Sequence, residues 1–86
     1  MSAKILCIED NPQNMRLVRK ILSSAGYETH EAVDGLSGLR MVQEERFALI
    51  LLDVNLPDID GLEVARHLKG NAETRSIPCI ALTANA

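Results

Sequence analysis

Four short apolar runs, separated by longer stretches with helical periodicity, constrain the fold of this chain more than any other feature. The runs predict strands at residues 4–8, 27–32, 48–52 and 77–82, with a helix between each pair of consecutive strands. Strands that alternate with helices along a chain are typical of a parallel sheet covered by crossover helices. We therefore predict an α/β fold built on a doubly wound parallel sheet.

The polarity of the runs predicts the order of the strands in the sheet. The first and third runs are almost continuously apolar, as in strands that are buried on both faces. The second run alternates polar residues such as Thr29 and Glu31 with less polar ones, which suits an edge strand. We expect the order 2-1-3-4, with right-handed crossovers that place helices on both faces of the sheet.

Capping residues mark the ends of the expected helices. Asn11 is a favourable N-cap, Pro12 suits the first helical position and Gly26 suits a helix end. Asp34, Asp58 and Asp60 are interpreted as turn and cap residues of the second and third helices. The second of these helices bears the apolar residues Leu36, Leu39 and Val42, and the third bears Leu62, Ala65 and Leu68.

Composition excludes several classes of protein. The 86 residues suffice for one small domain, and 47% apolar with 24% charged residues is a globular composition. No apolar run approaches the roughly 20 residues of a membrane helix, and the amino-terminal segment is too short and acidic for a secretory signal. A net charge of −3 and only one Tyr and one Phe argue against a nucleic-acid surface. We expect a cytoplasmic protein with no membrane or nucleic-acid partner.

The cysteines and histidines do not form a metal site or a redox pair. Cys7 and Cys79 each lie inside an apolar run, where a free, reduced thiol behaves as a small apolar side chain. His30 and His67 are distant in sequence from each other and from both cysteines. We therefore expect neither zinc binding nor redox chemistry.

Acidic residues gather where the expected strands end. Glu9 and Asp10 follow the first strand, Asp53 follows the third, and Thr83 follows the fourth. The carboxyl ends of parallel strands meet at one edge of the sheet, where open α/β folds place their sites. One acid there is commonly a solvated loop or cap residue, but three on neighbouring strands repel one another and favour a hard cation such as Mg²⁺.

Four blocks of residues then resemble a known family. They are Ile5 to Asn11 (ILCIEDN), the turn Asp34-Gly35, Asp53 to Gly61 (DVNLPDIDG) and Ile77 to Ala84 (IPCIALTA). Over its whole length the sequence resembles the receiver domain of two-component response regulators, and it is most similar to single-domain regulators and hybrid-kinase receivers. The resemblance implies a flavodoxin-like fold.

The resemblance also implies a phosphorelay function. Asp53 would accept a phosphoryl group from a histidine kinase or a histidine phosphotransfer protein, so the chain would be a phosphoacceptor and not a turnover enzyme. Asp10, Asp53 and the backbone carbonyl of Asn55 would bind Mg²⁺, and Glu9 would act mainly through water. Magnesium stabilises charge on the transferred phosphoryl oxygens.

Two further pairs of residues take their roles from the same resemblance. The Thr83 hydroxyl and the backbone N–H of Ala84 would hydrogen-bond phosphoryl oxygens. Pro57 and Gly61 would shape the loop that follows the third strand and would not take part in the chemistry.

The sequence departs from the family at its end. Receiver domains continue with a helix, a strand and a helix, and that strand carries a lysine that pairs with the phosphoryl group; this sequence stops at Ala86. We therefore expect residues 1–86 to be a truncated receiver domain that still binds metal but is phosphorylated less efficiently. The fourth strand becomes an exposed apolar edge, which predicts a homodimer formed through it.

Three functions stay open at this point. The first is the phosphoacceptor receiver, and the second is a non-signalling, self-associating scaffold whose exposed fourth strand drives dimer formation. The third is a phosphohydrolase similar to haloacid dehalogenases, but that class needs a second aspartate two residues after the nucleophile, where this sequence has Asn55.

Overall fold

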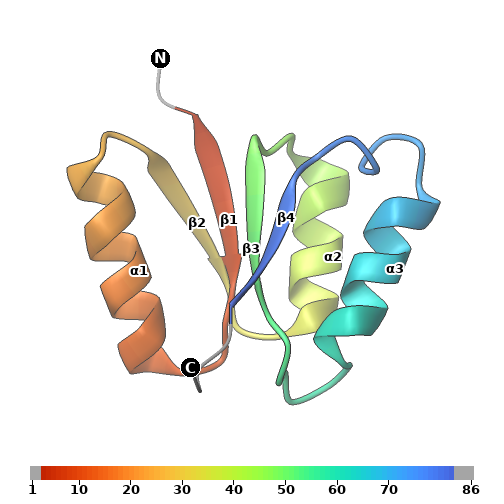
Figure 1. The fold of residues 1–86 in the computed structure, drawn as a ribbon, viewed down its shortest axis with the longest axis horizontal. Coiled ribbons are helices and arrows are strands. Elements are labelled where there is room, and N and C mark those ends of the chain that lie inside the picture. Colours follow the sequence, from red (N-terminus) through yellow and green to blue (C-terminus); the bar gives the residue numbers. More distant parts are fainter. Residues whose placement is uncertain (1–2, 83–86) are drawn as a thin grey trace.

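The computed structural model describes residues 3–82 as a four-stranded parallel sheet with helices on both faces (Figure 1). The strands lie in the order β2-β1-β3-β4, with α1 on one face and α2 and α3 on the other. The elements are β1 (Lys4–Ile8), α1 (Pro12–Ser24), β2 (Glu28–Ala32), α2 (Gly35–Glu44), β3 (Leu49–Asp53), α3 (Gly61–Gly70) and β4 (Cys79–Leu82). The predicted fold class and strand order are confirmed. No helix in residues 3–82 is long and apolar enough to cross a membrane.

The start of α1 follows from its capping residues. The side chain of Asn11 accepts hydrogen bonds from the backbone N–H groups of Gln13 and Asn14, at 2.9 and 3.2 Å. Pro12 occupies the first helical turn, where no intrahelical partner exists for a backbone N–H. After the helix the chain turns at Gly26, whose φ of 89° is unfavourable for any residue with a side chain.

The main core lies between the sheet and the pair α2 and α3. Strand residues such as Leu6, Ile8 and Ile50 are fully buried there and contact Val64 and Leu68 of α3 in one cluster. The side of α2 that faces the sheet contains glycine residues. A Cβ atom at Gly38 would lie 2.4 Å from Cδ1 of Ile8, so the helix backbone rests directly against β1.

The buried faces of these helices do not include every apolar residue of the sequence pattern. Leu36 and Leu62 are 55% and 62% exposed. Their places are taken by Gly35 at the start of α2 and by Val64 in α3. Each leucine also follows a buried glycine that begins its helix, Gly35 or Gly61, where a Cβ atom would lie 2.5 or 2.6 Å from neighbouring atoms.

The other face of the sheet is covered unevenly. Helix α1 packs over β2, and within residues 3–82 no helix lies over the β4 half of that face. Ile80 of β4 points to this side, because its neighbour Cys79 packs against the core on the opposite side. Its side chain is 52% exposed, and Leu17 and Ile21 of α1 are 59% and 58% exposed. The described structure thus leaves apolar side chains of both β4 and α1 open to solvent.

Candidate functional site

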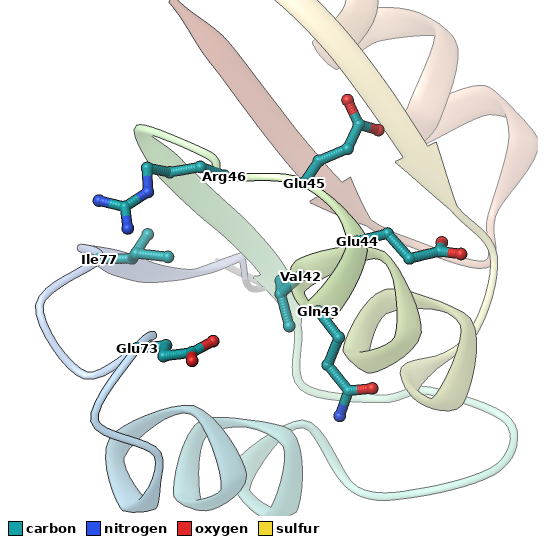
Figure 2. A pocket seen from close by; sticks show the side chains of 7 residues that line it. All are labelled: Val42, Gln43, Glu44, Glu45, Arg46, Glu73 and Ile77. Carbon is teal, nitrogen blue, oxygen red and sulfur yellow. The ribbon is translucent and has the colours of Figure 1, made fainter.

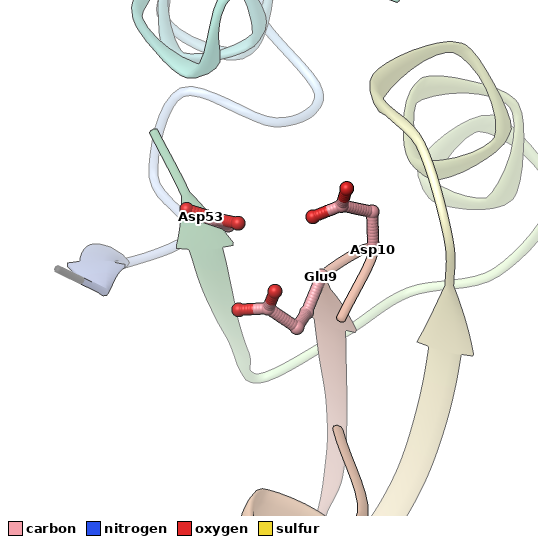
Figure 3. A group of neighbouring side chains, drawn as sticks. All are labelled: Glu9, Asp10 and Asp53. Carbon is pink, nitrogen blue, oxygen red and sulfur yellow. The ribbon is translucent and has the colours of Figure 1, made fainter. Parts of the chain in front are cut away.

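The register of β1 and β3 brings three carboxylates together at the carboxyl edge of the sheet. Ile8 pairs with Leu52, so the residues that come next, Glu9 and Asp53, lie side by side. Asp10 follows Glu9 at the end of β1. Figure 3 shows the three side chains around one space, and one carboxylate oxygen of each lies within 4.8 Å of those of the other two. The predicted convergence of Glu9, Asp10 and Asp53 is present in the structure.

Backbone N–H groups hold two of these carboxylates in place. The N–H of Asn11 donates to Oε1 of Glu9 at 3.0 Å, and the N–H of Asn55 donates to Oδ1 of Asp53 at 3.0 Å. Each bond spans two residues, so each acid is oriented by the loop that directly follows its own strand. The carboxylates are therefore set before any ligand enters.

The electrostatics of the cluster disfavour full ionisation in the absence of a cation. Glu9 and Asp53 are only 3% and 5% exposed, whereas Asp10 is exposed. Burial raises the pKa of Glu9 above its ordinary value; the Asn11 N–H opposes this rise, and the neighbouring Asp53 and Asp10 add to it. Within residues 3–82, no lysine, arginine or histidine forms an ion pair with these three acids, so the negative charge of the cluster is concentrated without a paired cation.

The donor set fits a hard divalent cation. All three side chains offer carboxylate oxygens, which are the ligands that Mg²⁺ prefers, and no sulfur or imidazole takes part. The exposed Asp10 leaves one side open to solvent, and a cleft of about 200 Å³ adjoins the cluster between α1 and the end of β2. A cation that retains several water ligands suits such a half-open site.

Replacing Glu9 with glutamine should stabilise the magnesium-free protein. Because the pKa of Glu9 is higher in the folded state than in the unfolded state, the folded protein gains stability as the pH falls through that raised pKa toward the ordinary value, and this stability is absent at neutral pH. Glu9→Gln removes the charge while retaining an oxygen that can accept from Asn11. We expect a higher melting temperature in EDTA at neutral pH.

Addition of Mg²⁺ should stabilise the wild type more than Glu9→Gln, so the advantage of the variant should shrink. Glu44→Gln, an exposed change in α2, is the control and should leave the melting temperature unchanged. A Glu9→Gln protein that melts below wild type in EDTA would contradict this account of the cluster.

The other predicted site residues have different outcomes. Thr83 and Ala84 lie outside the described residues. Asn55 and Pro57 lie in the loop after β3, with exposed side chains. Gly61 is packed against that loop: a Cβ atom there would lie 2.6 Å from the carbonyl oxygen of Asp53 and 2.6 Å from Cα of Val54.

Asp58 makes a contact that its sequence position does not indicate. Asp34 and Asp60 cap α2 and α3 locally, through hydrogen bonds from Ser37 N–H (2.8 Å) and Leu62 N–H (3.0 Å). Asp58 does not cap its own helix. Its carboxylate accepts from the N–H groups at the start of α2, which are 22 and 23 residues away in the chain. No local pattern could have revealed this contact.

The thiols and imidazoles stay apart from the acidic cluster. Burial, followed by the charges of Glu9 and nearby acids, raises the pKa of Cys7 to about 12, so this thiol is protonated at neutral pH. His30 lies on the edge strand β2, where its ring contacts Phe47 and its Nε2 lies 2.6 Å from Glu28 Oε2. His67 is exposed on α3.

A hollow of about 210 Å³ lies at the opposite edge of the sheet (Figure 2). It lies where α2 ends and β3 is about to begin, far from the carboxyl ends of the strands. Its charged side chains differ in sign and, as with Glu45 and Arg46, point in different directions. It is lined by Val42, Gln43, Glu44, Glu45, Arg46, Glu73 and Ile77. It offers no convergent set of groups comparable to the acidic cluster.

Comparison with known sequences identifies one family. The pattern of the response regulator receiver domain matches residues 5–86. The polar-differentiation response regulator DivK of Brucella anthropi is 44% identical over 86 residues, which are all of this chain and 70% of that protein. DivK of Brucella ovis is 43% identical over the same span.

Comparison with solved structures identifies the same family. The receiver domain of the sensor histidine kinase PA1611 from Pseudomonas aeruginosa, solved with a magnesium ion coordinated in its active-site cleft, superposes with a TM-score of 0.94 at 37% identity. The comparison covers all of this chain and 70% of that one. The chemotaxis response regulator CheY4 of Vibrio cholerae superposes with a TM-score of 0.94 at 31% identity, over all of this chain and 72% of its own.

Proposed function

This chain belongs to the response regulator receiver domain family, whose members are phosphoacceptors in signal transduction, and we propose that its phosphoacceptor is Asp53. The observation that carries the proposal is the convergence of Glu9, Asp10 and Asp53, because it places a buried, oriented carboxylate beside two further acids. Phosphoryl transfer depends mainly on positioning and charge stabilisation, which such a cluster supplies together with a cation.

Each residue of the cluster has a distinct role in this proposal. Asp53 is buried on β3 with Oδ1 held by the Asn55 N–H, which leaves Oδ2 as the attacking oxygen. Asp10 and Asp53, with the carbonyl of Asn55, would hold Mg²⁺, and Glu9 would hold a water ligand of the ion. The bound ion would neutralise charge on the phosphoryl oxygens. Thr83 and Ala84, which lie outside the described residues, are proposed to hydrogen-bond those oxygens.

The proposed phosphodonor is a phosphohistidine on a histidine kinase or a histidine phosphotransfer protein. In the transfer, the phosphorus–nitrogen bond of the donor breaks as a bond forms from Asp53 to phosphorus, and the imidazole leaves. The cleft beside Glu9 and Asp10 is lined by the exposed residues Arg16 and Arg19 of α1, of which Arg19 pairs with Glu31 at 2.8 Å. The charge of Arg16 would offset part of the repulsion between the acidic cluster and a phosphoryl group.

Acetyl phosphate provides the direct test of the proposal. In the presence of Mg²⁺, the intact protein should gain the mass of one phosphoryl group, and beryllofluoride should bind at the same residue. In EDTA neither adduct should form. A protein that binds Mg²⁺ but gains no mass would contradict the phosphoacceptor assignment.

We also propose that the chain self-associates through β4. The two edges of the sheet differ in charge: β2 (ETHEA) carries two glutamates and a histidine, whereas β4 (CIAL) carries no charged residue. Charged side chains protect an edge strand from pairing with another chain, and β4 lacks them. The exposed Ile80 and the adjoining apolar face of α1 would be covered in a two-fold dimer of two β4 edges.

Size-exclusion chromatography with light scattering should detect the dimer at micromolar concentration. Ile80→Lys places a charge on the edge and should give a monomer. Leu62→Lys is the matched control, because Leu62 is similarly exposed, at 62% against 52%, but lies on α3 on the other side of the sheet. A monomeric wild type, or equal effects of the two substitutions, would contradict an interface at β4.

A further inference from the structure

The loop between β3 and α3 is fastened to the start of α2 at two adjacent residues. Asp58 Oδ1 accepts from the Gly35 N–H and its Oδ2 from the Leu36 N–H, both at 2.9 Å. Beside this pair, Gly35 contacts Ile59 so closely that a Cβ at position 35 would lie 2.5 Å from Cγ1 of Ile59. One carboxylate and one apolar contact thus join two loops that are distant in the sequence.

The same loop carries the groups that surround the proposed phosphoacceptor. Asn55, three residues before Asp58, donates its N–H to Asp53 Oδ1. On the other side of Asp58, the Gly61 N–H donates to the Val54 carbonyl at 3.2 Å, and Gly61 has no room for a Cβ against the backbone of Asp53. The loop is therefore closed at its base by Gly61 and tied down at its tip by Asp58.

We propose that Asp58 is a positioning residue, which holds the loop so that the Asn55 backbone stays aligned with Asp53 for cation binding. Asp58 itself is exposed and does not belong to the acidic cluster. Asp58 acts on Asn55 through the backbone. The two hydrogen bonds fix the position of Asp58, so the three peptide units between Asp58 and Asn55 have little conformational freedom. This inference rests on the proposed function of Asp53 and Asn55.

Two properties of Asp58 support this role over simple capping. Both carboxylate oxygens are engaged, which specifies the orientation of the group as well as its distance. Desolvation alone would raise the pKa of Asp58, but the hydrogen bonds from the N–H groups of Leu36 and Gly35 lower the pKa below its ordinary value. The carboxylate is therefore ionised, and fully able to accept, throughout the neutral range.

Asp34 provides a matched control. It is also an aspartate that accepts a hydrogen bond from a backbone N–H in the first turn of α2, that of Ser37 at 2.8 Å. Asp34, however, directly precedes α2, and the hydrogen bonds that it accepts within the described residues come from α2 itself and not from the loop after β3. Loss of either carboxylate removes an N-terminal cap from the same helix, whereas only loss of Asp58 releases the loop.

The test compares Asp58→Ala with Asp34→Ala in the whole chain, first without magnesium. Hydrogen exchange read by NMR should show that the Asn55 and Gly61 amides lose protection, by about tenfold or more, in Asp58→Ala only. Calorimetric titration with Mg²⁺ should then show about tenfold weaker binding in Asp58→Ala and little change in Asp34→Ala, as expected when an outer group that orients a ligand is removed. If Asp58→Ala does not fold, Asp58→Asn, which retains one accepting oxygen, should show smaller changes of the same kind.

Two outcomes would overturn the proposal. Equal loss of amide protection in the loop of the Asp58 and Asp34 variants would show that Asp58 acts only as a helix cap. Unchanged protection in both variants would show that Asp58 does not hold the loop. The exchange measurement needs no metal. A wild type that binds no Mg²⁺ would therefore count against the proposed function, while the exchange result would still decide the role of Asp58.

Discussion

The Asp53→Asn variant is expected to form no phosphoryl adduct with acetyl phosphate and Mg²⁺, whereas the wild type gains one. In the proposed reaction of the wild type, a carboxylate oxygen of Asp53 attacks phosphorus while the bond to the acetate oxygen breaks and acetate leaves. An amide oxygen is a far weaker nucleophile, so the substitution should abolish the reaction rather than only slow it. Asparagine preserves the size of the side chain and an oxygen that can accept the Asn55 N–H bond, so the fold should persist.

The measurement is intact-protein mass spectrometry, with Asp60→Asn as the control. Asp60 lies in the same loop region but caps α3 and lies outside the acidic cluster. Asp60→Asn should therefore gain the phosphoryl mass as the wild type does. An adduct that persists in Asp53→Asn, or that maps to another acid, would assign the phosphoacceptor elsewhere.

Gly61→Ala is expected to have the largest effect on stability, a loss of about 2–3 kcal/mol in the free energy of unfolding. The new methyl group would lie 2.6 Å from the Asp53 carbonyl oxygen and from Val54 Cα, and both of these are backbone atoms that cannot rotate away. Either α3 or the end of β3 has to shift. Because that end carries Asp53, the proposed phosphoacceptor and metal ligand, the variant should also bind Mg²⁺ less tightly.

Gly70→Ala is the matched control at the other end of the same helix. Apart from its chain neighbours and the backbone of its own helix, no atom of residues 3–82 lies within 4 Å of a Cβ built on Gly70, and alanine has the higher helix propensity, by about 1 kcal/mol at most. Gly70→Ala should therefore be as stable as the wild type or slightly more so. Urea unfolding followed by circular dichroism measures both variants. Similar midpoints for the two would show that the contact at Gly61 relaxes without cost.

The acidic cluster was predictable because it follows from two simple facts. Apolar runs mark strands 1 and 3, and parallel strands deliver the residues after their carboxyl ends to one edge of the sheet. Once β1 and β3 are neighbours, Glu9 and Asp53 must lie together, whatever their side-chain rotamers. The strand order was predictable for a similar reason, since the polar second run is stable only at an edge.

The buried faces of α2 and α3 were not predictable from apolar spacing alone. Spacing identifies large apolar residues, and so it favoured Leu36 and Leu62, which are exposed. Glycine carries no apolar signal, yet Gly35 and Gly38 face the core because α2 approaches the neighbouring side chains too closely for any Cβ. How closely a helix approaches a sheet depends on the packing of the whole layer.

The sequence by itself determined the class of fold, the strand order and the identity of the three clustered acids, because each of these follows from local polarity and the geometry of parallel strands. Only the tertiary structure decided which small residues lie between helix and sheet, and that Asp58 fastens its loop to a helix 22 residues earlier in the chain. Such contacts join segments whose local sequences are independent of each other. They come into being only when packing brings the segments within hydrogen-bonding distance.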